Sequence, residues 1–419
     1  MDVSPRSGNM LGRLLLDSHL LTLEQLPQRL AERAAEGGFT DARIYLCDLQ
    51  QTVLRLLTGA GEDGRRETSG EETELRIDGT VAGRAFQHGR IQPVPLPGGR
   101  SGYHWWVPLL DGTERLGMLR VTTGDDADRT REQVQCLAAL VALIVVAKTG
   151  HSDAHARMIR TRPMSPAAEM QWNLMPPRTF ADARVVISAM LEPAYQLGGD
   201  AFDYSTSGDI LHLAVFDAMG HDTTAGLTAN LAVAACRAHR RRGADLAETA
   251  EAIENTLVAQ LGPMRFATAV LADLDTRTGV ITWVNHGHHP PVLIRGGRVT
   301  GELACPPAPP LGTDLGLPPV PCSRRLEPGD RLLFYTDGLI EARDASGQEF
   351  GLERFTDFVV RQHADGLSAP ETLRRLLRSV VEYHQGRLED DATVLLVEWH
   401  GNAPFAPGEV EMLTGLPEQ

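Results

Sequence analysis

The segment Ile210-Leu211-His212-Leu213-Ala214-Val215-Phe216-Asp217-Ala218-Met219-Gly220-His221 joins an apolar run to an acidic cluster. Residues 210–216 have the character of a buried strand, and Asp217 follows them directly. A carboxylate at the end of a strand is a typical way for a sheet protein to offer hard oxygen ligands to a divalent cation. The segment therefore predicts a strand-rich fold with a metal site at one edge.

Three further acidic clusters lie in the C-terminal half of the chain, and most of them adjoin a strand-like segment. Mg²⁺ and Mn²⁺ prefer octahedral shells of oxygen, so a few Asp carboxylates and a backbone carbonyl can hold two ions. Such ions neutralise phosphoryl oxygens and lower the pKa of a bound water. The pattern predicts a metal-dependent hydrolase. The clusters are Gly198-Gly199-Asp200, Tyr335-Thr336-Asp337-Gly338 and Glu389-Asp390-Asp391-Ala392-Thr393.

Residues 184–399 combine strand-like runs with amphipathic helices, without the regular alternation of a doubly wound parallel sheet. Many strands around a few long helices favour a layered α+β sandwich. We expect strands at 185–191, 210–216, 267–274, 280–284, 291–294, 331–335 and 392–398. We expect helices at 224–239, 246–261, 352–362 and 369–384.

The N-terminal residues 15–124 form a separate α+β pattern. A short helix with two glycines ahead of a phenylalanine is expected at 79–86, and a late strand carries Leu116-Gly117-Met118-Leu119. This order resembles a GAF-type sensor domain, which implies a small-molecule ligand of that domain. Trp105 and Trp106 have a high strand propensity, which favours a place in the core over a ligand pocket.

Residues 136–147 are apolar on every face of a predicted helix that runs from 125 to 148. Such a helix must be buried somewhere. It either packs inside the first domain or, as we prefer, forms a dimerising helix that connects a sensor to an effector. The second alternative predicts a homodimer with a helical linker at 125–164.

Composition narrows the class of protein. The net charge of −15 over 419 residues argues against nucleic acid as the main partner, because binding to a phosphate backbone needs a basic surface. We find no apolar run of about 18 residues that would span a membrane, and no signal peptide, so a cytoplasmic protein is expected. Five widely spaced cysteines predict neither a zinc site nor a disulfide framework. They are Cys47, Cys136, Cys236, Cys305 and Cys322.

Eight segments follow the order seen in PPM-type serine/threonine phosphatases of the SpoIIE branch, and together they cover residues 165–400. The resemblance implies an α-β-β-α sandwich with two Mn²⁺ or Mg²⁺ ions and a phosphoprotein substrate. The segments are Leu174-Met175-Pro176, Tyr195-Gln196-Leu197-Gly198-Gly199-Asp200-Ala201-Phe202-Asp203, Phe216-Asp217-Ala218-Met219-Gly220-His221, Phe266-Ala267-Thr268-Ala269, Asn285-His286-Gly287-His288-His289-Pro290-Pro291, Pro310-Leu311-Gly312, Tyr335-Thr336-Asp337-Gly338 and Asp390-Asp391-Ala392-Thr393.

The same resemblance implies roles for individual residues. Asp217 would bridge the two ions, with the Ala218 carbonyl on one of them. Asp337 and Asp390 would bind the opposite ion, and Asp200 would act mainly through water. Asp217, Asp337 and Asp390 are thus the predicted catalytic set. A hydroxide that bridges the ions would attack phosphorus in line. Four further residues would support these ligands without touching the ions, namely Asp203, Asp391, Gly338 and His221.

Several polar residues have a simpler interpretation. Asp222, Asp330 and Asp344 read as turn or cap residues. Arg237 and the run 240–242 read as cations that complement the end of a helix. His288 and His221 are expected to organise loops by hydrogen bonding. His286, His289 and Asp222 depart from the family pattern at positions that bind no metal, so they bear on loop shape and substrate fit.

These observations predict a phosphoserine/phosphothreonine protein phosphatase, regulated by its N-terminal domain and acting on a signalling partner of the anti-anti-sigma type. Two alternatives stay open. The chain is a dimeric ligand-sensing module whose phosphatase-like half docks partners, or it hydrolyses small phosphorylated metabolites. The expected parts are a GAF-like domain at 15–124, the linker at 125–164, the phosphatase domain at 165–400 and a flexible tail at 401–419.

Overall fold

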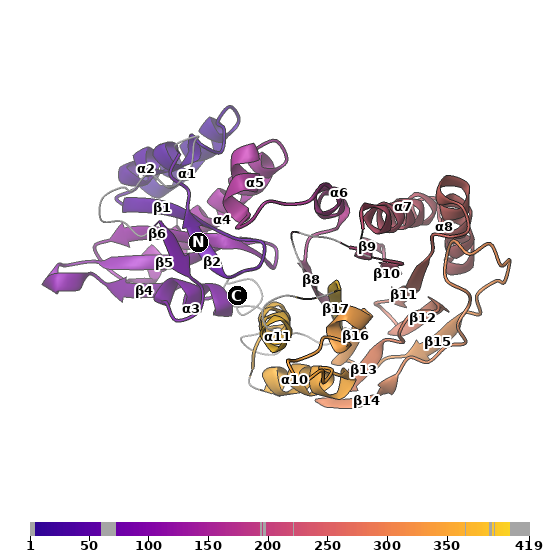
Figure 1. The fold of residues 1–419 in the computed structure, drawn as a ribbon. Helices are drawn as coiled ribbons and strands as arrows, with labels where there is room; N and C mark the ends of the chain where they lie inside the picture. The colour runs from indigo at the N-terminus through magenta and orange to yellow at the C-terminus, as the bar shows by residue number, and fades with distance from the viewer. Residues whose placement is uncertain are drawn as a thin grey trace. The chain divides into compact units, whose positions relative to one another are not determined.

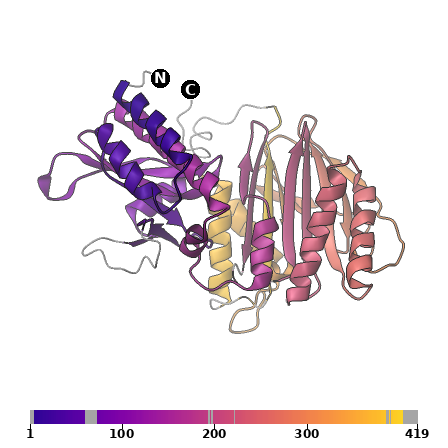
Figure 2. The same cartoon turned by 90° about the horizontal axis from the view of Figure 1, so that it is seen from above.

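The structure is a computed structural model of the 419-residue chain. It describes residues 5–59, 73–192, 195, 198–220, 222–364, 366–384, 388 and 390–402. The chain divides after Arg162 into two compact units, which Figures 1 and 2 show as ribbons and which are described separately. The predicted positions His221 and Glu389 and residues 403–419 of the expected tail lie outside the described residues.

The N-terminal unit is built on an antiparallel sheet of six strands in the order β3-β2-β1-β6-β5-β4. The strands are β1 (Thr40–Cys47), β2 (Val53–Leu56), β3 (Glu74–Arg76), β4 (Gln92–Pro95), β5 (Tyr103–Asp111) and β6 (Glu114–Thr123). The helices are α1 (Pro5–Ser18), α2 (Leu26–Glu36), α3 (Val81–His88), α4 (Asp128–Thr149) and α5 (Asp153–Ile159), with a 3-10 turn η1 (Pro97–Gly99).

Alternating side chains of this sheet supply two cores. On one face, Ile44 and Trp105 pack with residues of α1, α2 and α4, such as Val141. On the other face, Tyr45 and Met118 pack around α3. This division follows from the strand period of two residues, which sends neighbouring side chains to opposite faces. Trp105 is fully buried, as its strand propensity predicted.

Helix α4 corrects two predictions from the sequence. It is long and apolar enough to cross a membrane by length and composition alone, although core helices pass the same test. The structure packs it against β5 and α1 inside the N-terminal unit, with Val134, Val141 and Val145 buried. Of the two interpretations from the sequence, the structure therefore agrees with a helix packed inside the first domain. The homodimer stays a prediction.

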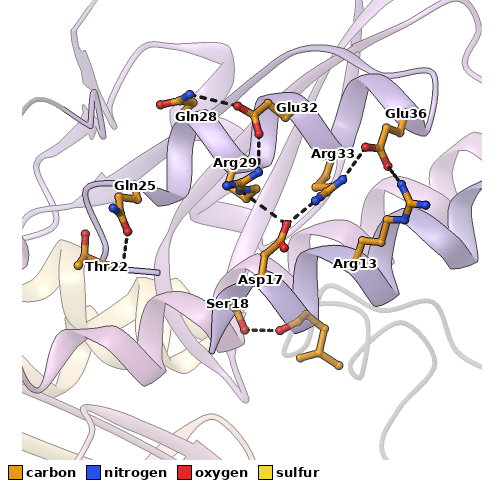
Figure 3. A network of polar contacts seen from close by, with 11 residues as sticks. Arg13, Asp17, Ser18, Thr22, Gln25, Gln28, Arg29, Glu32, Arg33 and Glu36 are labelled. Atoms are coloured by element: carbon orange, nitrogen blue, oxygen red, sulfur yellow. Dashed lines mark hydrogen bonds and ion pairs between the residues drawn. The ribbon is translucent and has the colours of Figure 1, made fainter. Parts of the chain in front are cut away.

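Helix α1 was not predicted from the sequence, and ion pairs connect it to α2 (Figure 3). Asp17 on α1 accepts a hydrogen bond from Arg33 Nε on α2 at 2.8 Å. Arg33 also pairs with Glu36 at 2.6 Å, and Arg13 pairs with Glu36 at 3.3 Å. The network fixes the register of the two helices over the sheet.

The C-terminal unit stacks two antiparallel sheets, in the orders β15-β12-β11-β10-β9 and β14-β13-β16-β17-β8-β7. The strands are β7 (Thr179–Ala181), β8 (Val185–Glu192), β9 (Asp200–Ser207), β10 (Ile210–Ala218), β11 (Ala267–Asp275), β12 (Val280–His286), β13 (Val292–Arg295), β14 (Arg298–Glu302), β15 (Cys322–Arg325), β16 (Asp330–Tyr335) and β17 (Ala392–Trp399). The helices are α6 (Pro166–Leu174), α7 (Thr223–Arg240), α8 (Leu246–Leu261), α9 (Asp337–Ile340), α10 (Leu352–Ala364) and α11 (Ala369–Tyr383).

Three apolar cores hold the layers of this unit together. One core lies between the two sheets and includes Phe202, Val215 and Leu395. A second joins α7 and α8 to the first sheet, and a third joins α10 and α11 to the second sheet. Figure 1 shows these helix pairs beside their sheets. The α-β-β-α sandwich expected for this part of the chain is confirmed.

Cys305 and Cys322 form a disulfide, so the prediction of no disulfide was wrong. Seventeen positions separate the two residues, and their Cα atoms are 5.9 Å apart. The sequence spacing gives no sign of this pairing, because the loop after β14 returns the chain to β15 only in the folded protein.

Candidate active site

Carboxylates from both sheets meet at one end of the sandwich. Asp217, the last residue but one of β10, lies opposite Asp200 at the start of β9. Strand alternation places Asp217 on the face of Val215, and Asp200 on the face of Phe202, which is the face between the sheets. From the second sheet, Asp337 follows β16 and the pair 390–391 precedes β17.

A buried threonine connects the two sheets at this point. Thr336 Oγ1 donates to Asp200 Oδ2 at 2.6 Å and accepts from the backbone N–H of Thr393 at 2.9 Å. The backbone N–H of Asp200 donates to Asp391 Oδ2 at 3.4 Å. Thr336 is fully buried, and Asp200 and Asp391 are less than 5% exposed. These contacts fix Asp200 and Asp391 across the gap between the sheets.

The carboxyl groups repel one another strongly. Burial first, and then the charges of Asp337 and Asp390, raise the pKa of Asp217 to about 7. Burial first, and then the charges of Asp390 and Asp217, raise the pKa of Asp391 to about 8 against the opposing effect of backbone N–H groups. Burial also raises the pKa of Asp200, with Asp391 and Asp217 adding to it. Without a cation, burial and mutual repulsion thus favour the protonated form of these carboxyl groups, and a bound cation would favour their ionised form.

Glycines let the chain segments approach closely here. A Cβ atom on Gly199 would overlap the carbonyl oxygen of Ala218, and one on Gly338 would overlap that of Asp391. The backbone N–H of Ala218 also donates to the Gly199 carbonyl at 3.0 Å. Any side chain at these two positions would push the acidic segments apart.

The donor chemistry of this group fits hard cations. All the charged groups that approach one another are carboxylates, which are the ligands that Mg²⁺ and Mn²⁺ prefer. Among the described residues, no three Asp, Glu, His or Cys side chains stand ready-made as a cation site. Binding an ion at this group therefore requires the carboxylates to move toward it.

Asp203 does not join this group, contrary to the supporting role expected for it. It lies on the opposite face of β9, where Arg237 Nη2 donates to Oδ1 at 2.7 Å and Arg240 Nη1 donates to Oδ2 at 2.8 Å. The period of two residues in a strand separates Asp203 from Asp200. The arginines of α7 are thus ion-pair partners, which adds to the helix-end role that the sequence suggested.

His288 organises the loop behind the carboxylates, as predicted. Its Nε2 lies 3.0 Å from the carbonyl oxygen of Tyr335, which can only accept, so Nε2 carries the proton. Its Nδ1 then accepts from Thr268 Oγ1 at 2.7 Å. Burial, and then His289, lower the pKa of His288 to about 4, which keeps the ring neutral. His288 therefore links β11 to the end of β16.

The expected turn and cap residues divide into two groups. Asp222 accepts from Ala225 N at 2.8 Å as the N-cap of α7, and Asp344 closes its turn by accepting from Ser346 N at 2.8 Å. Asp330, however, is buried and pairs with Arg295 at 2.6 Å, so it is more than a turn residue.

Sequence reasoning missed the hydroxyl and amide groups that hold the acids. Thr336 and Thr393 stand inside the quoted motifs, one position before Asp337 and two positions after Asp391, and that position was the available signal. Gln171 on α6 donates to the carbonyl oxygen of Asp200, and Asn285 bonds the backbone of His288. Asn285 lies in a quoted motif three residues before its partner, so its position was also an available signal. For Gln171 the sequence offers none, because its partner is a backbone carbonyl 29 residues further along the chain.

Comparison with known proteins finds similarity mainly in the C-terminal unit. Residues 207–400 match the family model of stage II sporulation protein E, SpoIIE. The chain is 25% identical over 137 residues to protein IcfG of Synechocystis sp., covering 32% of this chain and 20% of that protein. It is 21% identical over 232 residues to the phosphoserine phosphatase RsbU of Bacillus subtilis, covering 55% of this chain and 68% of that protein.

A similar solved structure contains the RsbU and RsbW domains of a Mycobacterium tuberculosis protein. It is 29% identical, covers 53% of this chain and 62% of that chain, and has a TM-score of 0.44. The match to IcfG spans only a fifth of that protein, so IcfG extends well beyond the part that it shares with this chain.

Proposed function

The C-terminal unit of this chain is a SpoIIE-type phosphatase domain of the PP2C class, and on that premise we propose that the protein removes phosphate from phosphoserine or phosphothreonine in a signalling protein. One observation supports the proposal above the others. Carboxyl groups from four separate segments meet at one end of the sandwich, where burial and mutual repulsion raise the pKa values of Asp217 and Asp200. The name of RsbU favours phosphoserine as the substrate group.

Each residue of the candidate site has a proposed role. We assign Asp217, Asp337 and Asp390, with Asp200 and the Ala218 carbonyl, to hold two Mg²⁺ or Mn²⁺ ions. Bound ions of this kind supply a deprotonated water near neutral pH and neutralise phosphoryl oxygens. Thr336 holds the Asp200 carboxylate in place, and the Asp391 carboxylate accepts from the Asp200 backbone. His288, kept neutral by burial, positions the loop behind Asp337 without adding charge.

The test measures phosphate release from a phosphoserine peptide with and without Mn²⁺. Asp337→Asn should lower kcat by at least about a hundredfold, since it removes a ligand on which charge stabilisation depends. Asp357→Asn, which changes an exposed carboxylate on α10, is the matched control and should keep full activity. Full activity of Asp337→Asn, or activity that chelator does not affect, would refute the proposal.

We further propose that the N-terminal unit is a GAF-like sensor that controls the phosphatase domain. Its six-stranded antiparallel sheet with helices on both faces supports this reading. The test compares the phosphatase activity of the full chain with that of a chain starting near Ser165. A several-fold difference in kcat is expected, and equal activity of two folded proteins would count against control by this unit.

The substrate that we propose is a small phosphoprotein of the anti-anti-sigma type. The support is the similarity to RsbU and to a protein that contains RsbU and RsbW domains. A phosphorylated protein of this type should be dephosphorylated with a much higher kcat/KM than a generic aryl phosphate. Equal kcat/KM for the two substrates would favour the alternative of a hydrolase for small phosphorylated metabolites.

A further inference from the structure

A cavity lies in the C-terminal unit, away from the candidate active site, between helix α8 and the loop that connects β14 to β15. Its volume is about 390 Å³, and none of the carboxylates of the candidate active site lines it. Prolines 309, 310, 318 and 319 and the side chains of Leu315 and Leu317 form the loop wall. These two leucines are more than 60% exposed, so the apolar wall of the cavity is open to an incoming group.

His286 contributes a buried hydrogen-bond acceptor to this cavity. Its Nδ1 lies 2.9 Å from the carbonyl oxygen of Pro309, which can only accept, so Nδ1 carries the proton. Its Nε2 therefore presents a lone pair, and that atom has no hydrogen-bond partner among the described residues. The side chain is 4% exposed and lines the cavity. A buried polar atom of this kind calls for a partner, which here must be a hydrogen-bond donor.

The charge of the residues that line the cavity also favours a hydrogen-bond donor, and one that is positively charged. Five carboxylates line the cavity, with no lysine or arginine among the lining residues, and they are Asp245, Glu248, Glu251, Glu254 and Asp314. Glu254 is engaged by the backbone N–H groups of Gly312 and Asp314, which fixes the loop. Asp245 and Glu248 form the capping box of α8. Within the described chain, Glu251 makes no such contact and is exposed, so it is the acid available to a ligand.

The spacing of the acceptor groups around the cavity indicates which kind of cation can bind. A metal ion needs several donors around one point, but no three acidic, histidine or cysteine side chains of the described residues are arranged in that way. An organic cation with N–H groups can reach separated acceptors, and its alkyl chain can lie along Leu315, Leu317 and Ala250. We propose that this cavity binds the guanidinium or ammonium end of an alkyl chain, which donates to His286 Nε2 and lies against Glu251.

Two sources can supply this chemistry, a free alkyl cation or the side chain of an arginine or lysine in a partner protein. The experiment titrates the full-length protein by calorimetry with agmatine, N-acetylarginine amide and N-acetylcitrulline amide. Citrulline has the shape of arginine without its charge. Tighter binding of agmatine indicates a free small molecule, and tighter binding of the arginine amide indicates a protein side chain. No binding up to about 10 mM, or equal binding of the citrulline compound, would overturn the proposal.

Variants locate the binding in this cavity. Glu251→Gln should lower the affinity for the bound cation by about tenfold, which corresponds to the loss of one charge contact. Glu353→Gln, an equal change of an exposed acid on α10 that does not line the cavity, should leave the affinity unchanged. Equal affinities of the two variants would show that the cation does not bind in this cavity.

A second measurement does not depend on a variant of His286 that folds. The protein is labelled with ¹⁵N-histidine, and binding should shift the resonance of one unprotonated Nε2 in the direction expected when that atom accepts a hydrogen bond. If the His286→Gln variant folds, the resonance that it lacks identifies the signal of His286. Saturating ligand that moves no histidine Nε2 would contradict the proposal. Both experiments measure binding and not turnover, so their failure is distinct from a failure of the proposed phosphatase activity.

Discussion

At the scale of single residues, the site depends on neutral groups that hold charged ones. Thr336 receives a backbone N–H from one segment and donates its hydroxyl proton to Asp200 on another. Thr336→Val keeps the shape and removes this link, so the buried Asp200 carboxyl group loses one of its hydroxyl donors. We expect a loss of about 1–3 kcal/mol in the free energy of unfolding, measured with urea, together with lower phosphate release. Thr223→Val, at an exposed position of α7, should change neither, and an equal loss there would contradict the assignment.

Asp203 tests the distinction between the two faces of β9. Its carboxylate is 1% exposed and pairs with Arg237 and Arg240, so Asp203→Asn leaves two guanidinium groups around a neutral amide. We expect a loss of about 3–5 kcal/mol in stability, as for a broken buried ion pair. Calorimetry should find the Mn²⁺ affinity of the remaining folded protein unchanged. A selective loss of metal affinity at unchanged stability would return Asp203 to the supporting role that the sequence suggested.

At the scale of elements, the sequence predicted best where local signals and packing agree. Helix α8 was expected at 246–261 and is observed at those bounds, because Asp245 and Glu248 form a capping box ahead of an amphipathic stretch. Strand β9 was missed, since its sequence Asp-Ala-Phe-Asp-Tyr-Ser-Thr-Ser breaks the apolar pattern. Its acids are tolerated because Asp200 faces the site and Asp203 meets two arginines, and such long-range partners leave no local trace in the sequence.

The loop between β14 and β15 gives a prediction for an element held by a covalent bond. The disulfide between Cys305 and Cys322 closes a loop whose unfolded state it restricts. Replacing both cysteines by serine should lower the free energy of unfolding by about 3 kcal/mol, the value for a loop of about this length. Cys136→Ser is the control that leaves the loop closed. If thermal unfolding of the double variant matches that of the parent in oxidising buffer, the disulfide does not stabilise the protein.

At the scale of the whole molecule, the two units have separate cores, and the pairing of strands within each could not be read from the sequence. The predicted runs showed many of the strands, but the order β14-β13-β16-β17-β8-β7 pairs β17 with β8, which lies more than a hundred residues earlier in the chain. The same long-range pairing brings Asp217 and Asp337 to one end of the sandwich. The order of the motifs along the chain indicated this meeting only through the family resemblance.

Because each unit closes its own core, we expect two transitions in calorimetric unfolding, and pH should identify the N-terminal one. Burial, and then Arg160, lower the pKa of His155 in α5 from its ordinary value of 6.5 to about 4. Between these pH values the unfolded chain binds a proton at His155 and the folded unit does not. The free energy of unfolding therefore falls as the pH drops from about 6.5 toward 4, by at most about 3 kcal/mol. His155→Gln should reduce this pH dependence in one transition and leave the other unchanged. An equal change in both transitions would show that the two units unfold as one.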